Sequence, residues 1–267
     1  MSDSVRANLH LRVLNQDRTI GVEVPQGPVR LADLLPAARA LCNEMTAAAV
    51  EDARRQGKTI SCRAGCGACC RQLVPISLVE AQSLAELVAS MPHDRQRVIR
   101  SRFAAAVARL ESAGLLDPAQ PRGHRGLLFD GSACALDVFP RVHHEYFRHQ
   151  IPCPFLENES CGIHPDRPLV CREYHVTTSP DHCAAHDAGR VNAVKPPLQM
   201  GDVLCSAASR LTGLPALTIP LILSLEWAEA HAATLDRIID GDGAFRTLLS
   251  ELDRRFERAF DARSDGG

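Results

Sequence analysis

The sequence has few aromatic residues, no long apolar run and almost no net charge. Aromatic residues make up 4% of its 267 residues, and the formal net charge is −2. The longest apolar stretch, residues 214–225, contains two prolines and is shorter than the ~20 residues that a membrane-spanning helix needs. We therefore expect no membrane partner, and no nucleic acid partner, because no broad basic surface is available to attract a phosphate backbone.

Two sequence signals are also missing. The N-terminal residues MSDSVRANLH lack the apolar run after a basic start with which a secretory signal begins. No glycine fingerprint of the G-x-G-x-x-G type follows a strand pattern, so no dinucleotide-binding fold is indicated. From the first absence we expect a cytoplasmic, reducing setting, in which cysteines are metal ligands before they are disulfides.

Cysteine, in contrast, is abundant, with 11 in the chain. Four lie in one short loop at C-x3-C-x2-C-C spacing, which comprises Cys62, Cys66, Cys69 and Cys70. A second set lies further along the chain and comprises Cys153, Cys161, Cys171 and Cys183. So many thiols have little structural use in a reduced protein unless they hold a metal or do redox chemistry. We expect the two sets to meet in one metal-binding region, with all eight cysteines as metal ligands.

Glycine suits the first loop to ligation. Gly65 and Gly67 tolerate the positive φ angles of tight turns, so the first three cysteines of the loop can converge on a metal, which for zinc means sulfur atoms ~2.3 Å from the ion. The side chains of the adjacent Cys69 and Cys70 are expected to diverge. One of these two cysteines then serves a second metal or is not a direct ligand.

Charged and titratable residues surround the second set. Pro168 is typical of the first turn of a helix, which places Cys171 where the helix dipole is expected to lower the pKa of a thiol. Four arginines flank the ligands and are expected to offset thiolate charge: Arg63, Arg71, Arg167 and Arg172. Histidines close to the second set are weaker candidates for ligands: His164, His175, His182 and His186.

Three cysteines stand apart from these sets. Cys42 and Cys205 lie in apolar helical patterns, where a reduced cysteine behaves as a small hydrophobic residue. We expect both to be core residues. For Cys134 the sequence favours neither the core nor the metal site.

Apolar periodicity predicts a mainly α fold. Alternation over residues 9–14 and 18–24 predicts a β-hairpin, and Ser77 and Glu80 form a capping box that starts a helix. Helices are predicted at 31–57, 77–91, 94–113 and 134–149 and in pieces over 201–260, with loops at 114–131 and 150–199. We expect a hairpin extension over residues 1–30 and a single helical domain over 31–267, with the cysteine-rich core at about 60–185.

The spacing of Cys62, Cys66 and Cys69 also matches the signature of radical S-adenosylmethionine enzymes. In those enzymes the loop follows the first strand of a partial (β/α) barrel. Here it follows a predicted helix, and no alternating series of strands and helices comes after it. The sequence therefore does not indicate that fold.

Together, the two cysteine sets resemble the YkgJ-like CxxCxxCC family, described as zinc- or iron-chelating proteins. The resemblance rests on the first cysteine loop, the CPFL run at Cys153, the CGI run at Cys161, and Arg167-Pro168 leading to Cys171-Arg172. It covers about residues 60–185, and His164 stands where the family usually has tyrosine. The family includes flagellin lysine N-methylases, which look like iron–sulfur proteins that use S-adenosylmethionine, so the resemblance implies an iron–sulfur cluster.

Three functions follow as hypotheses. The first is a metal-binding protein with iron in a 4Fe–4S type of cluster, favoured by thiolates in excess of one tetrahedral site. The second is a structural zinc module that binds a protein partner. The third, by family analogy only, is an enzyme that transfers methyl groups from S-adenosylmethionine to lysine in a protein substrate.

Overall fold

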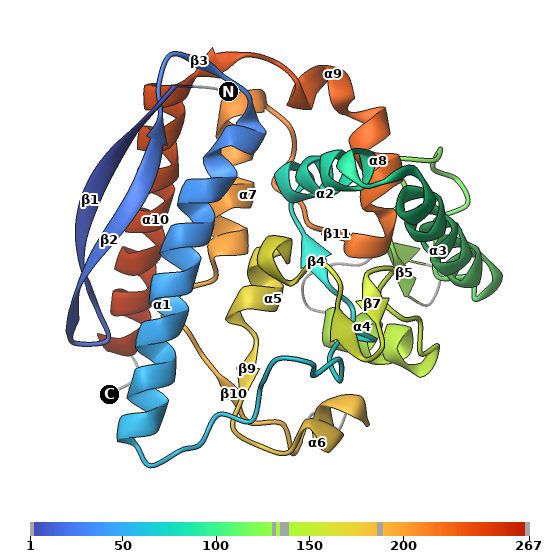
Figure 1. Ribbon diagram of the computed structural model, residues 1–267, viewed down its shortest axis with the longest axis horizontal. Coiled ribbons are helices and arrows are strands. Elements are labelled where there is room, and N and C mark those ends of the chain that lie inside the picture. The colour runs from blue at the N-terminus through green and yellow to red at the C-terminus, as the bar shows by residue number, and fades with distance from the viewer. Residues whose placement is uncertain (1–2, 130–131, 134–138, 186–188, 265–267) are drawn as a thin grey trace.

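The computed structural model describes residues 3–129, 132–133, 139–185 and 189–264. The fold is mainly α with a small N-terminal β-hairpin, as predicted (Figure 1). The α-helices are α1 Leu35–Arg55, α2 Leu78–Ser90, α3 His93–Ser112, α4 Phe139–Arg148, α5 Leu169–Glu173, α6 Pro180–Ala184, α7 Met200–Thr212, α8 Ser224–Ala230, α9 Ala232–Leu235 and α10 Gly241–Ser264. The 3-10 helices are η1 Leu31–Leu34, η3 His164–Asp166 and η4 Leu221–Leu223.

The hairpin joins strands β1 (Ser4–Val13) and β2 (Gln16–Pro25). Its two turn residues, Leu14 and Asn15, have φ angles of 49° and 61°, which suits the right-handed twist of the paired strands. The turn is one residue tighter than the alternation predicted, and both strands are longer. The apolar side chains of β2 are buried, and this strand packs against α1 and α10.

Two groups of helices divide the core. Helices α1, α7 and α10 pack on one side under the hairpin, while α2, α3 and α8 form the other side. Apolar residues at helical spacing on α1, including Leu41 and Met45, are buried. On α3 the apolar spacing of Val98 with Phe103, Val107 and Leu110 predicts that Val98 faces the core. This prediction is wrong for Val98, which is 46% exposed, whereas Ile99 is buried.

Helix α2 begins with the predicted capping box. The Ser77 hydroxyl accepts from Glu80 N, and the Glu80 carboxylate accepts from Ser77 N at 2.9 Å. The second Glu80 oxygen accepts from Leu169 N at 2.8 Å, so this buried carboxylate also holds the start of α5. The first cysteine loop ends just before this cap, and Cys171 lies on α5. The capping box therefore connects the two cysteine sets.

Apart from the hairpin, each strand in the described ranges is two residues long and pairs antiparallel with one other strand. The pairs are β3 Pro28–Val29 with β12 Ile239–Asp240, β4 Pro75–Ile76 with β11 Ile219–Pro220, β5 Leu128–Phe129 with β6 Ser132–Ala133, β7 Leu156–Glu157 with β8 Ser160–Cys161, and β9 His175–Val176 with β10 Ala193–Val194. The helix predicted over 134–149 is α4, and residues 134–138 lie outside the described residues. No helix in the described part of the chain has the length and apolarity to cross a membrane.

Candidate metal centre

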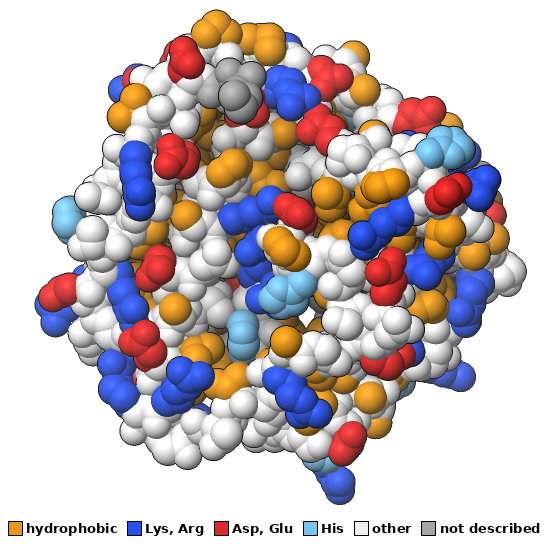
Figure 2. Space-filling view, in the orientation of Figure 1, with side chains coloured by type: hydrophobic (Ala, Val, Ile, Leu, Met, Phe, Trp, Pro, Cys, Tyr) orange, Lys and Arg blue, Asp and Glu red, His pale blue; other side chains and the backbone are white. Residues whose placement is uncertain are grey.

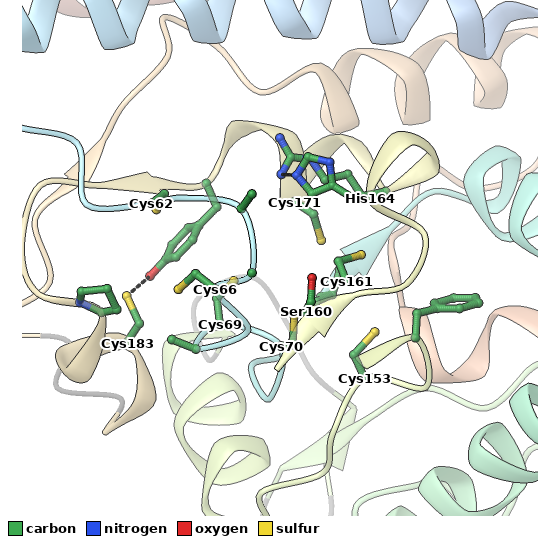
Figure 3. A pocket seen from close by; sticks show the side chains of 18 of the residues that line it. Cys62, Cys66, Cys69, Cys70, Cys153, Ser160, Cys161, His164, Cys171 and Cys183 are labelled. Atoms are coloured by element: carbon green, nitrogen blue, oxygen red, sulfur yellow. Dashed lines mark hydrogen bonds between the residues drawn. The ribbon is translucent and has the colours of Figure 1, made fainter. Parts of the chain in front are cut away.

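One cavity, with a volume of about 320 Å³, brings the two cysteine sets together. Eight thiol-bearing residues line it: Cys62, Cys66, Cys69, Cys70, Cys153, Cys161, Cys171 and Cys183. The expectation that the two sets meet in space is therefore confirmed. Figure 3 shows their side chains distributed around the cavity, and Figure 2 shows basic and histidine side chains gathered near the middle of the face drawn there.

Direct contacts hold the first loop against the β7–β8 turn. Cys153 N donates to Cys70 O at 2.7 Å, and Arg71 binds the Glu159 carboxylate through two hydrogen bonds of 2.6 and 3.0 Å. Phe155 anchors the same segment on α3, since its ring packs edge-on against Phe103 with the centroids 5.4 Å apart. Hydrogen bonds between protein groups therefore join the two loops.

Gly67 lies where the two loops touch. A methyl group there would come within 2.7 Å of Glu159 O and 2.8 Å of the Leu156 side chain. We expect Gly67→Ala to push the loops apart and to lower the free energy of unfolding by about 1–3 kcal/mol, as at other overpacked sites. Metal affinity should fall at least about tenfold, as it does when second-shell contacts are disturbed. Isothermal titration with the metal measures this effect.

Gly65 supplies the matched control for that substitution. It has a φ of +78° but nothing within 4 Å of an added methyl group. Alanine there costs about 1–2 kcal/mol of backbone strain and leaves the contact between the loops in place. Equal metal affinity in the two variants would show that the close approach at Gly67 has no part in the site.

The cysteines lie on two sides of the cavity (Figure 3). The Cys62 group, on one side, consists of Cys62 and Cys183. The Cys161 group, on the other side, consists of Cys153, Cys161 and Cys171. Cys66, Cys69 and Cys70 lie between them in that view.

The Cys62 group is held by β9 and α6. Cys62 Sγ accepts from Val176 N at 3.3 Å, and Cys183 Sγ lies 3.8 Å from the Tyr174 hydroxyl. Tyr174 was not predicted to belong to the site, although it is one of only two tyrosines in the chain and follows Cys171 by three residues. Its hydrogen bond with Cys183 depends on the fold and has no signature in the spacing.

Cys69 and Cys70 both line the cavity, and the divergence of their side chains stays a prediction. The neighbouring Cys70 side chain and burial raise the pKa of Cys69. A thiol with a raised pKa keeps its proton until a metal replaces it.

Burial raises the pKa of most thiols in the cavity. It raises the pKa of Cys153 to about 12 and that of Cys171 well above the ordinary value, with further increases from neighbouring thiols. The expectation that a helix dipole lowers the pKa of Cys171 was wrong, because α5 has only five residues and desolvation outweighs any dipole that so short a helix provides.

Arg167 is the arginine whose charge acts on several of these thiols. It lines the cavity and lowers the pKa of Cys62, Cys69 and Cys161, although burial and neighbouring thiols outweigh this effect. Its Nε atom is buried without a hydrogen-bond partner in the described structure. A cationic side chain with an unpaired donor suits a cavity that becomes negatively charged when thiolates bind a metal.

The other flanking arginines are engaged differently. Arg63 lines the cavity, whereas Arg71 is paired with Glu159. Arg172 donates to Asn43 and to the carbonyl oxygens of Arg167 and Pro165. Arg71 and Arg172 therefore fasten the loops around the site.

The histidines differ in their availability as ligands. His164 Nε2 lies 2.9 Å from Arg167 Nη1, and because arginine can only donate, this nitrogen accepts and its lone pair is occupied. Arg167 also lowers the pKa of His164. His175 lines the cavity, and burial lowers its pKa. His182 lies on α6, and His186 lies outside the described residues.

The two cysteines expected in the core are buried there. Cys42 is fully buried on α1 with its thiol 3.7 Å from Leu169 O. Cys205 on α7 is 8% exposed and donates to Leu217 O at 3.1 Å. Cys134 lies outside the described residues, and the ten described cysteines are all free thiols.

The eight thiols suit a metal that prefers sulfur ligands, although their side chains do not converge on one point. In the part of the chain that the structure describes, no three His, Cys, Asp or Glu side chains are placed so that they could hold a single ion. Tetrahedral zinc requires sulfur atoms about 2.3 Å from the ion. The eight thiols instead surround a cavity, so that binding requires them to move inward or to enclose a guest larger than one ion.

Comparison with known proteins agrees with this site. Residues 61–188 match the CxxCxxCC family model, described as "Putative zinc- or iron-chelating domain". Searches of curated proteins and of solved structures gave no significant match. The matched range begins just before Cys62 and includes all eight cavity cysteines, while the hairpin and the C-terminal helices lie outside it. Residues 61–188 are therefore similar to the family that the two cysteine sets resemble.

Proposed function

We propose that this protein binds iron as an iron–sulfur cluster of the 4Fe–4S type in a reducing, cytoplasmic setting. The proposal rests on the eight cysteines that line one cavity. We propose that these eight cysteines are the metal ligands. Iron–sulfur clusters are held by cysteine thiolates, and a zinc- or iron-chelating domain is the coarser function that the family match supports. The free state of the described cysteines suits a reducing compartment.

The arrangement of the thiols favours a cluster over a single ion. A tetrahedral zinc ion needs its sulfur ligands about 2.3 Å from one point, whereas no three such donors in the described part of the chain are placed to hold a single ion. A guest with several metal atoms and bridging sulfide can accept thiolates that are spread around a cavity wall. Arg167, with its unpaired buried Nε, supplies positive charge next to such a guest.

Anaerobic purification tests the proposal. The protein is expected to be brown and to contain iron and acid-labile sulfide, with the iron content measured by elemental analysis and the cluster type by its visible and paramagnetic resonance spectra. Cys42→Ser, whose thiol lies in the core, is the matched control and should keep the colour. A colourless wild-type protein with stoichiometric zinc would reject the iron–sulfur cluster.

Metal binding is expected to release protons and to strengthen as the pH rises. Burial raises the pKa of several cavity thiols, for example to about 12 at Cys153, so these thiols are protonated at neutral pH and each must lose its proton to bind a metal. Affinity is therefore lost as the pH falls and gained as it rises, by about tenfold per pH unit for each proton released. Proton release at pH 7, measured with an indicator dye during titration of the metal-free protein, should approach one proton per ligand thiol. Release of no protons would contradict the raised pKa values.

A structural zinc module that binds a protein partner is a second candidate. The observation in its favour is the segment from β7 to β10, whose described strands are two residues long and offer little regular structure of their own. Because binding energy is folding energy at such sites, a chelator should unfold this segment, as measured by circular dichroism and limited proteolysis. A metal-free protein that keeps its ellipticity and its resistance to protease would remove the support for this candidate.

Methyl transfer to lysine in a protein substrate stays a prediction from resemblance. Calorimetric titration of the metal-loaded protein with S-adenosylmethionine tests it, and absence of binding counts against it.

The division into a hairpin extension over residues 1–30 and a helical domain over 31–267 is likewise proposed, with limited proteolysis as its test.

A further inference from the structure

We infer that the thiol-lined cavity also binds a small oxyanion, a carboxylate or a phosphate, through the cationic side chains on its wall. The side chains that bind it are Arg63, His164 and Arg167, all of which line the cavity. The oxyanion is a second ligand beside the proposed metal. None of its three side chains is among the eight cysteines proposed as metal ligands, so binding of the anion and binding of the metal can be measured separately.

The charged side chains on the cavity wall are of one sign. Among the described residues that line the cavity, two are arginines and two are histidines, and none is an aspartate or a glutamate. A free thiol is mainly protonated at neutral pH, because its ordinary pKa is about 8.5, and the described cysteines are all free. The wall therefore carries net positive charge before the thiols bind a metal. A cleft that is lined by one sign of charge concentrates ions of the other sign.

The two arginines on the wall lack the carboxylate partner that a neighbouring arginine has. On the first cysteine loop, Arg71 lies outside the cavity lining and pairs with Glu159 at 2.6 Å. Within the described part of the chain, neither Arg63 nor Arg167 forms an ion pair with a carboxylate. A guanidinium keeps its charge at every physiological pH. The positive charge at these two positions is therefore available to an anion that enters the cavity.

Hydrogen-bond donors accompany this charge. Arg167 Nη1 donates to His164 Nε2 at 2.9 Å, so the proton of a neutral His164 ring lies on Nδ1, which is a donor. Arg167 Nε is buried without a partner in the described structure, and a buried donor without an acceptor is destabilising. Arg63 and His164 are exposed, whereas Arg167 is half-buried. An oxyanion that enters the cavity therefore meets charged donors at the surface and further inside.

The size and lining of the cavity select a small molecule. Its volume of about 320 Å³ is at the lower end of the roughly 300–1,000 Å³ that small-molecule pockets have. Apolar side chains, including Val74, Phe155 and Leu221, line the same cavity and suit a ligand with a short carbon skeleton behind its anionic group. A guanidinium binds a carboxylate or a phosphate through two parallel hydrogen bonds. These two groups therefore share the chemistry that the site recognises.

Calorimetric titration of the full-length protein, as purified, tests the oxyanion site. The probes are succinate and inorganic phosphate, at constant ionic strength so that general screening does not change. Saturable binding of at least one probe is expected. Arg63→Gln and Arg167→Gln should each weaken this binding by about tenfold or more, because each removes a hydrogen bond between charged groups. Tighter binding of succinate would identify the ligand as a carboxylate, and tighter binding of phosphate would identify it as a phosphorylated molecule.

Arg97→Gln is the matched control. It removes the same charge from a side chain that is 72% exposed and does not line the cavity, and it should bind the probe as the wild type does. Absence of binding by the wild type, or equal affinities in all four proteins, would overturn the inference. Elemental analysis of the same samples separates the two ligands. Protein that contains metal but binds neither probe overturns the oxyanion site alone, whereas probe binding by protein that contains no metal supports the oxyanion site and counts against the metal centre.

Discussion

Serine in place of Cys69 is expected to remove most of the bound metal. Cys69 lines the cavity together with the other seven thiols and lies near their middle in Figure 3. Loss of a second-shell partner already costs 10–100-fold in metal affinity, and we expect the loss of this proposed ligand to cost at least about 100-fold. Elemental analysis of Cys69→Ser purified without oxygen measures the effect.

Two conservative controls separate this effect from a general loss of stability. Cys42→Ser and Cys205→Ser remove thiols that are buried away from the cavity. Both should keep the wild-type metal content, and Cys42→Ser should lower the free energy of unfolding by about 1–3 kcal/mol, because a smaller and more polar hydroxyl replaces a fully buried thiol. If Cys69→Ser and Cys42→Ser retain equal amounts of metal, the cavity is not the metal centre.

Local patterns predicted the elements of the fold well. The alternation on both sides of Asn15 gave the hairpin, and the Ser77 capping box gave the start of α2. These features depend on residues that are neighbours in the sequence. The inward face of α3 was partly missed, because Val98 and Ile99 are both apolar and only the position of the neighbouring helices decides which of them is buried.

Spacing also predicted which cysteines gather, but it did not predict their chemistry. The eight cavity cysteines were identified from two local motifs, and Cys42 and Cys205 were correctly expected in the core. The raised pKa of Cys171 was not foreseen, because desolvation depends on the whole surrounding fold and exceeds the local helix dipole. The hydrogen bond between Tyr174 and Cys183 was missed for the same reason.

Removal of the Glu80 carboxylate is expected to have the largest effect on stability. Glu80 is buried and accepts hydrogen bonds from Ser77 N and Leu169 N at 2.9 and 2.8 Å. Glu80→Ala leaves these two backbone donors without an acceptor, and each buried unpaired donor costs about 1–3 kcal/mol, so a loss of about 2–6 kcal/mol is expected. Urea unfolding followed by circular dichroism measures the change.

Glu86 on the same helix is the matched control. Its carboxylate is 44% exposed and pairs with Arg30 at 2.5 Å, an interaction that is worth about 0–1 kcal/mol at a surface. Glu86→Ala should therefore leave the unfolding midpoint nearly unchanged. Equal midpoints in the two alanine variants would contradict the assigned role of Glu80.

Glu80→Ala should also affect the metal, although Glu80 is not a ligand. Its bond to Leu169 N fixes the first residue of α5, two residues before Cys171, and the Ser77 cap fixes the chain that leaves the first cysteine loop. Loss of both restraints loosens the approach of one cysteine set to the other. Metal affinity should fall by about 10–100-fold, as for other residues that orient ligands, whereas Glu86→Ala should bind as the wild type does. Because the same carboxylate holds both segments, the stability of the fold and the affinity for the metal are expected to fall together.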